Sequence, residues 1–213
     1  MGGRRSVIAM TSSPTPIRSV TLEVADTADA QDFYATAIGP DERIRFAEAT
    51  PDTAGFRGFV LSLVVAEPAV VDSFYDAAIA AGAQSTKPAQ KSLWGYGGAF
   101  RAPDGTVWTI ASSSKKNTGA PLRVIDDLVL QLGVDDVAAT KNFYTDHGLS
   151  VAKSFGRKYV EFESSPGSVT LALSGRKLAA KNAGVAHEGG GAHRLRIDGA
   201  IGRATDPNGF AWS

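Results

Sequence analysis

Cysteine is missing from this sequence of 213 residues, and histidine occurs three times. Without a thiol the chain has no disulfide, no thiolate zinc site and no cysteine nucleophile, a composition that fits a reducing compartment. An excess of charge of one sign is also missing, because 22 basic residues are balanced by 22 acidic ones. No overall field therefore attracts the chain to nucleic acid, and we expect no nucleic-acid partner.

Long hydrophobic runs are missing as well. The opening MGGRRSVIAM has only VIAM after its arginines. This run is too short for the core of a secretory signal, and no later segment reaches transmembrane length. We therefore expect a cytoplasmic location and no membrane partner. Residues 1–16 are rich in Gly, Ser, Thr and Pro and are predicted to form a disordered leader.

Several catalytic and nucleotide-binding motifs are also lacking. No G-x-G-x-x-G opens a helix after a strand, no Walker lysine is present, and no nucleophile elbow is visible. With 43% hydrophobic and 21% charged residues, the chain still has the composition of an ordinary globular protein. What remains to indicate a function is a repeat and the two-sided pattern of the strands.

The repeat is built from a turn and a helix. APDGTVWTIA at 102–111 returns as TDPNGFAWS at 205–213, and each copy predicts a tight turn that leads into a strand. A strand followed by a helix with Phe-Tyr occurs at Phe33 and again at Phe143. Self-similarity of this kind predicts two related units that pack together.

The composition between the two copies suggests where the units divide. We expect a first unit at 17–112, a polar and turn-forming linker at 113–121 and a second unit at 122–213. The second unit is abbreviated, because HRLRID at 193–198 leaves no room for a helix like the one that the first unit has at 67–83.

The leading strand of each unit alternates, so one face packs on helices and the other looks away from them. The apolar faces consist of Val20, Leu22 and Val24 in the first unit and of Leu128, Leu130, Leu132 and Val134 in the second. The opposite faces consist of Ser19, Thr21 and Glu23 in the first unit and of Val129 and Gln131 in the second.

Further elements follow the leading strands. In the first unit GFVLSLVVA predicts a strand from Gly58, and EPAVVDSFYDAAIAAGA predicts a helix with Pro68 in its first turn and Gly82 at its end. In the second unit KYVEFES and SVTLALSG, separated by Ser-Pro-Gly, predict a hairpin.

These segments, taken in order, resemble the vicinal oxygen chelate superfamily, the group of glyoxalases, bleomycin-resistance proteins and extradiol dioxygenases. The resemblance rests on the Phe-Tyr helices, GFRGFVLSLVV, VDSFYDAAIAAGA, LWGYGGAFRAPDGTVWTIA and KNAGVAHEGGGAH, and covers most of residues 18–213. It implies an α+β fold in which tandem βαβββ modules form curved mixed sheets around concave cavities, with the helices on the outer face.

The resemblance also implies where a metal would bind. Metal-dependent members carry histidine on the first strand and glutamate four residues after the turn glycine. The matching positions in this chain are Ser19, Val129, Thr109 and Ser213. None of these is a strong ligand for a divalent ion, so no metal cofactor is expected. The alternative is a divalent metal ion in an unorthodox site built from Glu23, Glu161 or His193.

The cavity faces implied by this fold supply the candidate ligand-binding residues. They are Ser19, Thr21, Glu23, Ser62, Trp94, Tyr96, Thr109, Val129, Gln131, Tyr159, Glu161 and His193. Trp94 and Tyr96 either stack on a planar ligand or fill space next to glycines. His193 either touches a ligand or makes local hydrogen bonds where a strand begins.

Glu23 is the candidate catalytic residue, with two interpretations left open. Burial in the cavity would raise its pKa and make it a general base. Otherwise it is a carboxylate at a wet pocket rim, paired with an arginine such as Arg57 or Arg101. Glu161 likewise either lines the cavity or belongs to the polar side of an ordinary strand.

The sequence supports a function without metal more readily than one with metal. The first hypothesis is a metal-free protein that binds a small hydrophobic or aromatic metabolite or antibiotic in a sheet-lined cavity. The second is a divergent lyase or dioxygenase, with an unorthodox metal site or with Glu23 as general base. The third is a degenerate structural or interaction protein. We expect a monomer or a homodimer with a small-molecule ligand.

Overall fold

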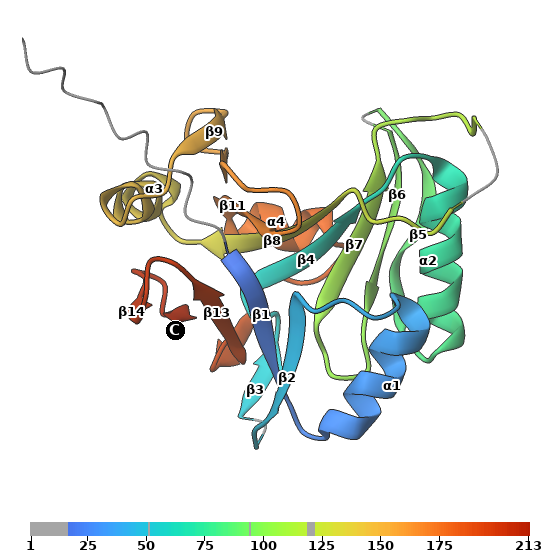
Figure 1. Cartoon of the computed structure of the whole chain (residues 1–213), viewed down its shortest axis with the longest axis horizontal. Helices are drawn as coiled ribbons and strands as arrows, with labels where there is room; N and C mark the ends of the chain where they lie inside the picture. The colour runs from blue at the N-terminus through green and yellow to red at the C-terminus, as the bar shows by residue number, and fades with distance from the viewer. Residues whose placement is uncertain (1–16, 51, 94, 119–121) are drawn as a thin grey trace, which may run out of the picture.

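The computed structural model of the chain describes residues 17–50, 52–93, 95–118 and 122–213. The expected leader at 1–16, part of the expected linker and Trp94 lie outside these residues. The helices are α1 (Thr27–Ala37), α2 (Pro68–Ala80), α3 (Val137–Asp146) and α4 (Arg176–Asn182). They accompany a large mixed sheet (Figure 1), so the expected α+β class is confirmed.

Residues 59–175 contain two βαβββ modules in full, and we call this part the complete unit. Its strands are β4 (Phe59–Val64), β5 (Gln84–Ser92), β6 (Gly95–Arg101), β7 (Val107–Ser112), β8 (Asp127–Val134), β9 (Val151–Ser154), β10 (Tyr159–Phe162) and β11 (Val169–Gly175). In each module the first strand pairs in parallel with the last, β4 with β7 and β8 with β11. The two modules join where β4 runs antiparallel to β8.

A second group of strands has the same pattern with parts missing, and we call it the abbreviated unit. It consists of β1 (Ile17–Val24), α1, β2 (Ile44–Glu48), β13 (Leu195–Gly199), β14 (Ala204–Thr205) and β15 (Ala211–Trp212). β1 pairs with β2 in parallel and with β13 antiparallel, and β13 pairs with β15 in parallel. No helix stands between β13 and β15, as the short sequence predicts.

The strand pairing crosses the boundary that the sequence repeat suggests. The complete unit takes its first module from the first repeat copy and its second module from the second copy, and the abbreviated unit combines the two ends of the described chain. The two units share one sheet through a single pair, Ile17 on β1 with Val169 on β11. A separate two-stranded sheet is formed by β3 (Thr53–Gly55) and β12 (Gly189–Gly191).

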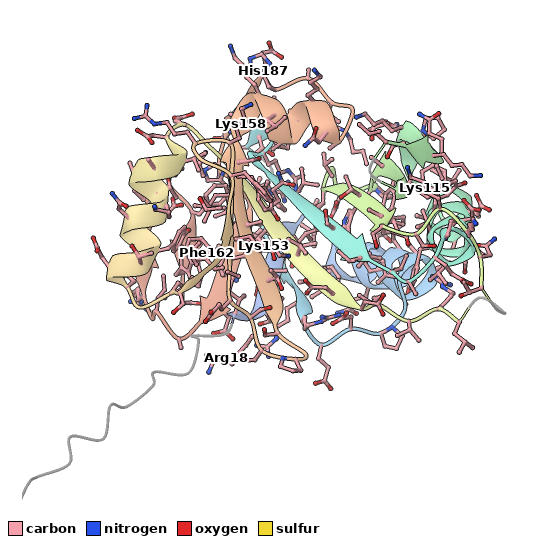
Figure 2. All side chains as sticks on the ribbon, turned by 90° about the horizontal axis from the view of Figure 1, so that it is seen from above. Arg18, Lys115, Lys153, Lys158, Phe162 and His187 are labelled. Carbon is pink, nitrogen blue, oxygen red and sulfur yellow. The ribbon has the colours of Figure 1, made fainter. Side chains whose placement is uncertain are left out.

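The alternation of the leading strands places their apolar residues in the main core. The core residues on β1 and β8 are Val20, Leu22, Val24, Leu128, Leu130, Leu132 and Val134, each 1% exposed or less. Helices α1, α2 and α3 contribute Tyr34, Phe74 and Tyr144 to the same core. Phe162, on the α3 side of the sheet in Figure 2, packs edge-on against Tyr144. None of the described helices has the length and apolarity needed to cross a membrane.

The two repeated turns are held by matching hydrogen bonds. In the first, Trp108 Nε1 donates to the Tyr34 hydroxyl at 3.1 Å, and this hydroxyl donates to Asp104 Oδ2 at 3.1 Å. In the second, Trp212 Nε1 donates to the Tyr144 hydroxyl at 3.2 Å, which donates to Asp206 Oδ2 at 3.0 Å. We call these the first and second Tyr-Asp-Trp clusters.

Each cluster joins one unit to the other. Tyr34 belongs to α1 of the abbreviated unit, but its partners lie on the turn and strand β7 of the complete unit. Tyr144 belongs to α3 of the complete unit, and its partners lie at the C-terminal turn of the abbreviated unit. The sequence repeat therefore marks the two places where helices of one unit are fastened to turns of the other.

Candidate functional site

The concave face of the complete unit is the side of its sheet away from α2 and α3. Four residues lie side by side across its middle, one on each of the central strands β7, β4, β8 and β11. They are Thr109, Ser62, Val129 and Thr170, and we call them the central row. The Ser62 and Thr109 hydroxyls form a hydrogen bond with each other. Two of the predicted site residues, on the first and last strands of one module, are thereby joined directly to each other.

The central row does not fit the divalent metal that the resemblance implies for this fold. Two of its hydroxyls are bonded to each other, Val129 offers no donor, and Thr170 is bonded to a carboxylate. A divalent ion needs several nitrogen or oxygen donors that together offset its charge. Among the residues that the structure describes, no group of three or more His, Asp or Glu side chains is placed to hold a metal.

An open pocket of about 540 Å³ adjoins this row over β5, β6 and β7. Its lining includes Lys87, Gln90, Thr109, Ala111 and Asn182. Gly97 on β6 pairs with Ala111 on β7. Because glycine has no side chain, nothing projects from position 97 into the pocket. The pocket is thus bounded by the sheet and, at one side, by the end of α4. Its volume is typical of a site for a small organic molecule.

Helix α4 fills the other end of the concave face. A small apolar cluster, separate from the main core, consists of Phe56, Val60, Val107, Ala179, Ala180 and Ala183. In Figure 1 this helix lies behind β8 and β4, against the face opposite the other helices. Lys87 Nζ donates to the carbonyls of Lys181 and Asn182, both at 2.8 Å, and so caps the helix C-terminus. The helix therefore covers the part of the face that contains Val60 and Gly133.

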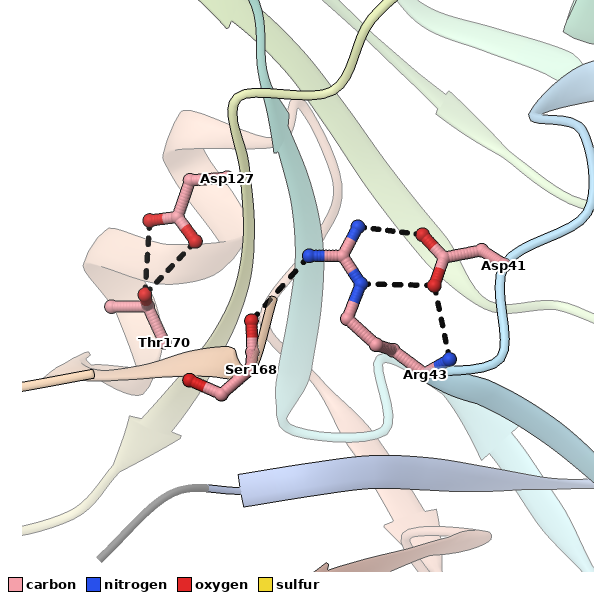
Figure 3. A network of polar contacts seen from close by, with 5 residues as sticks. All are labelled: Asp41, Arg43, Asp127, Ser168 and Thr170. Atoms are coloured by element: carbon pink, nitrogen blue, oxygen red, sulfur yellow. Dashed lines mark hydrogen bonds and ion pairs between the residues drawn. The ribbon is translucent and has the colours of Figure 1, made fainter. Parts of the chain in front are cut away.

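A carboxylate borders the central row at its open end. Asp127, the cross-strand neighbour of Val64, is half-buried, and the Thr170 hydroxyl lies 2.9 Å from each of its oxygens (Figure 3). Burial raises the pKa of the Asp127 carboxyl, the Thr170 hydrogen bond opposes this, and the negative charge of Glu161 adds to it. The Asp127 carboxylate is therefore a charged group that water solvates only in part.

Glu161 and Tyr159 face the same side from β10, and both are engaged. Lys153 Nζ lies 2.8 Å from Glu161 Oε1, and the Tyr159 hydroxyl donates to Glu161 Oε2 at 2.8 Å. Burial, with the hydrogen bond to Glu161 second, raises the pKa of Tyr159 above its usual range. Gln131, also on this face, donates to the Ser174 hydroxyl at 2.7 Å. The concave face of the complete unit thus carries six of the predicted site residues: Ser62, Thr109, Val129, Gln131, Tyr159 and Glu161.

Three predicted residues lie instead on the matching face of the abbreviated unit. Ser19 is fully buried, and its hydroxyl is 3.4 Å from Asp198 Oδ2, whereas Thr21 is half-buried beside it. Glu23 forms an ion pair with Arg196, with 3.3 Å between Oε1 and Nε. Glu23 is therefore paired with an arginine, as its second interpretation expects, but the partner is Arg196 and neither Arg57 nor Arg101.

The remaining candidates lie away from both faces. The Tyr96 side chain points to α2 and donates to Asp72 Oδ1 at 2.7 Å, which raises the pKa of Tyr96 to about 12. Tyr96 is also one of the residues that line the pocket. His193 stacks on Phe210, and its two ring nitrogens lie 2.6 and 2.8 Å from the carbonyl oxygens of Arg57 and Asn208. Both ring nitrogens are thus engaged within the chain, as the second interpretation expects, but their partners lie 136 and 15 positions away in the sequence and are not local.

Two features of the site were not predicted from the sequence, namely the pair of Thr170 and Asp127 and the position of helix α4. Thr170 and Asp127 follow from the alternation of SVTLALSG and of DLVLQLGV, because each sits on the same side as residues already selected. Helix α4 has a weaker signal, the helix-favouring run RKLAAK after Gly175. Its position over the sheet depends on alanines small enough to approach β8 closely, which no local pattern indicates.

No protein-family model and no curated protein matches the sequence. Among solved structures, a mutant of glyoxalase I from Zea mays aligns with a TM-score of 0.60 at 12% identity, over 93% of this chain and 91% of that one. A "putative dioxygenase" from Bacillus subtilis aligns with a TM-score of 0.56 at 17% identity, over 88% of this chain and 71% of that one. These likenesses confirm the vicinal oxygen chelate fold that the sequence motifs suggested.

Proposed function

We propose that this chain binds a small organic molecule on the concave face of the complete unit, without a resident metal ion. The observation that carries the proposal is the 540 Å³ pocket whose lining includes Thr109, the first residue of the central row that continues with Ser62, Val129 and Thr170. Such a pocket needs shape and a few polar groups to bind a ligand, and hydroxyls suffice for that.

The polar groups around the pocket support recognition of a partly apolar ligand. Ala111 and Gly97 offer a flat surface, and Gln90 and Asn182 supply amides at the margin. The pocket is open to solvent on one side, which suits a metabolite or antibiotic that is only partly enclosed. A hydrophobic or aromatic body over β6 and β7 with polar substituents toward the central row fits this surface.

The enzymatic alternative finds less support from the same geometry. Glu23, the candidate general base, belongs to the abbreviated unit and pairs with Arg196 rather than facing the pocket. Glu161 has both oxygens engaged, and both His193 nitrogens face carbonyls. A lyase or dioxygenase reaction through these residues would need one of them released from its partners.

The proposal is tested by a thermal-shift screen of several hundred metabolites, with hits confirmed by calorimetry. Ala111, exposed on the pocket floor, is replaced by Trp to fill the space, and Ala80, exposed at the end of α2, is replaced by Trp as the matched control. We expect Ala111→Trp to weaken hits at least about tenfold and Ala80→Trp to leave them unchanged. Hits that bind both variants equally would place the ligand elsewhere.

Elemental analysis of the purified protein decides the metal question separately. Stoichiometric nickel, zinc, iron or manganese retained through purification would contradict the metal-free proposal and favour the enzyme. Turnover lost in Glu23→Gln while binding stays intact would likewise favour catalysis, and would move the active centre to the abbreviated unit.

A further inference from the structure

The carboxylate of Asp127 is the least compensated charged group on the concave face. A carboxylate can accept about four hydrogen bonds. The only side-chain donor to Asp127 within the described residues is the Thr170 hydroxyl, whose single proton is shared between two oxygens at 2.9 Å each and which also lies 2.8 Å from Ser164. The Leu128 backbone N–H and the charge of Arg43 also act on Asp127, so part of its accepting capacity is left for a group that the chain does not supply.

The cations nearest to Asp127 are committed to other partners. Arg43 holds Asp41 through two bonds, Nε to Oδ1 at 2.9 Å and Nη2 to Oδ2 at 2.6 Å, and its third nitrogen reaches the Ser168 carbonyl (Figure 3). Lys153 is bonded to Glu161. None of the ion pairs among the described residues includes Asp127.

The surroundings of Asp127 are apolar on the side that faces the central row. Val64, its cross-strand neighbour, is 37% exposed, although valine side chains are usually buried. Val129 follows two positions along β8 on the same face and is also partly exposed. A carboxylate thus stands at one end of an accessible aliphatic strip.

We propose that Asp127, set against Thr170 and flanked by Val64 and Val129, anchors the ammonium group of an organic amine whose apolar body lies along the central row. This inference rests on the proposed function and gives its ligand a chemical class. An ammonium group supplies the donors and the positive charge that the site lacks, and a charge-assisted hydrogen bond is about twice as strong as a neutral one. The negative charge of Glu161 adds to the preference for a cation, and the positive charge of Arg43, which is bonded to Asp41, opposes it.

The ligand class is tested with two probes of nearly the same shape, 2-phenylethylammonium chloride and 2-phenylethanol, titrated into the full chain by calorimetry. We expect the ammonium to bind at least about tenfold more tightly than the alcohol. Asp127→Asn keeps an acceptor for Thr170 but removes the charge, and it should bring the affinities of the two probes to nearly the same value.

Asp126→Asn is the matched control, because Asp126 is the adjacent acid, is exposed, and makes only a backbone hydrogen bond to Val64. It should retain the tenfold preference. Unfolding midpoints of both variants show whether each is folded under the conditions of the titration.

Equal affinity of the wild-type chain for the two probes, or a preference that survives Asp127→Asn, would overturn the assignment of an amine. If both probes bind equally and Ala111→Trp removes both, the pocket is still the binding site and only the ligand class is wrong. If neither probe produces heat, the amine assignment also fails, while the metabolite screen continues to decide the proposed function.

Discussion

The complete and abbreviated units use the same Tyr-Asp-Trp cluster in sheets of very different extent. Trp108 lies on the six-residue strand β7, which has β4 and β6 on its two sides. Trp212 lies on the two-residue strand β15, between β13 and the two-residue strand β14. Within the described residues, the abbreviated unit lacks the second helix and most of the outer strands, but it contains the same cluster.

The presence of the cluster in both units has a physical reason, because the clusters connect one unit to the other. The sheet passes from one unit to the other through a single residue pair, Ile17 with Val169, which is a weak junction. The clusters add a connection at each end, because α1 is tied to the complete unit and α3 to the abbreviated one. Helices and strands that take no part in this fastening can be missing without separating the units.

The two concave faces differ in how their charges are satisfied. On the abbreviated unit, Asp198 accepts from Arg18 at 2.8 Å and lies 3.8 Å from Arg45, and Glu23 is paired with Arg196. On the complete unit Glu161 is likewise paired with Lys153, but Asp127 has a hydroxyl partner and forms no ion pair among the described residues. Paired charges are typical of a solvated sheet face, whereas an unpaired, half-buried carboxylate next to a pocket is typical of a binding site.

The largest expected effect comes from removing the indoles. Trp108→Ala should lower the free energy of unfolding by about 4–5 kcal/mol and Trp212→Ala by about 3 kcal/mol, within the range for buried tryptophan. The difference arises because β7 pairs with its neighbours along six residues and resists relaxation, whereas β15 pairs with its neighbours along only two. Urea unfolding of both variants measures it. A larger loss for Trp212→Ala would show that the abbreviated unit, despite its missing parts, carries the greater share of the stability.

A smaller effect is expected from removing only the hydroxyls. Tyr34→Phe and Tyr144→Phe each leave a buried indole N–H without its acceptor and remove the tyrosine donor from Oδ2 of the aspartate, whose Oδ1 keeps its backbone donors; the loss costs about 1–3 kcal/mol. Tyr144→Phe should cost more, because Asp206 is 4% exposed, whereas Asp104 is partly open to water. Burial and the neighbouring carboxylate raise the pKa of both hydroxyls, so both remain donors at neutral pH.

Thermal unfolding at pH 7 measures these losses, and the matched single variants serve as controls for each other. Equal losses for Tyr34→Phe and Tyr144→Phe would contradict the view that carboxylate burial decides the cost. A loss below a few tenths of a kcal/mol in either would mean that the corresponding cluster does not fasten the units.

The sequence predicts local structure well where one strand face is buried. Val20, Leu22 and Val24 identify the core side of β1, and Pro68 and Gly82 mark the ends of α2 within a residue or two. In both cases the signal is local, since alternation and the special backbone demands of proline and glycine act within a few residues.

The partners of the strands could not be predicted in the same way. Alternation shows which side of β4 is apolar but not that β4 pairs with β8 from the other repeat copy. Tyr96 stands in a glycine-rich strand, where no alternating pattern shows that its ring turns to α2. Arg196 was missed as the partner of Glu23 because the pairing of β1 with β13 decides it.

The smallest expected effect concerns the pH dependence of two aspartates, one on each concave face. Burial raises the pKa of Asp127, so its charging destabilises the fold as pH rises from the unfolded value of about 3.9 through the higher folded value. The Arg18 hydrogen bond lowers the pKa of Asp198, so its stabilising effect is present above about pH 3.9 and lost as pH falls through the lower folded value.

Asn variants of the two residues should therefore change the curve of unfolding free energy against pH in opposite directions. Asp127→Asn should be more stable than wild type near pH 7 and converge with it in acid, and Asp198→Asn should be less stable near pH 7 and converge likewise. Urea unfolding from pH 2.5 to 7 and carboxyl NMR titration measure both, with Asp126→Asn as control. If Asp127 titrated below Asp198, a cation from the chain would already occupy its site, and neither the comparison of the two faces nor the inferred amine site would hold.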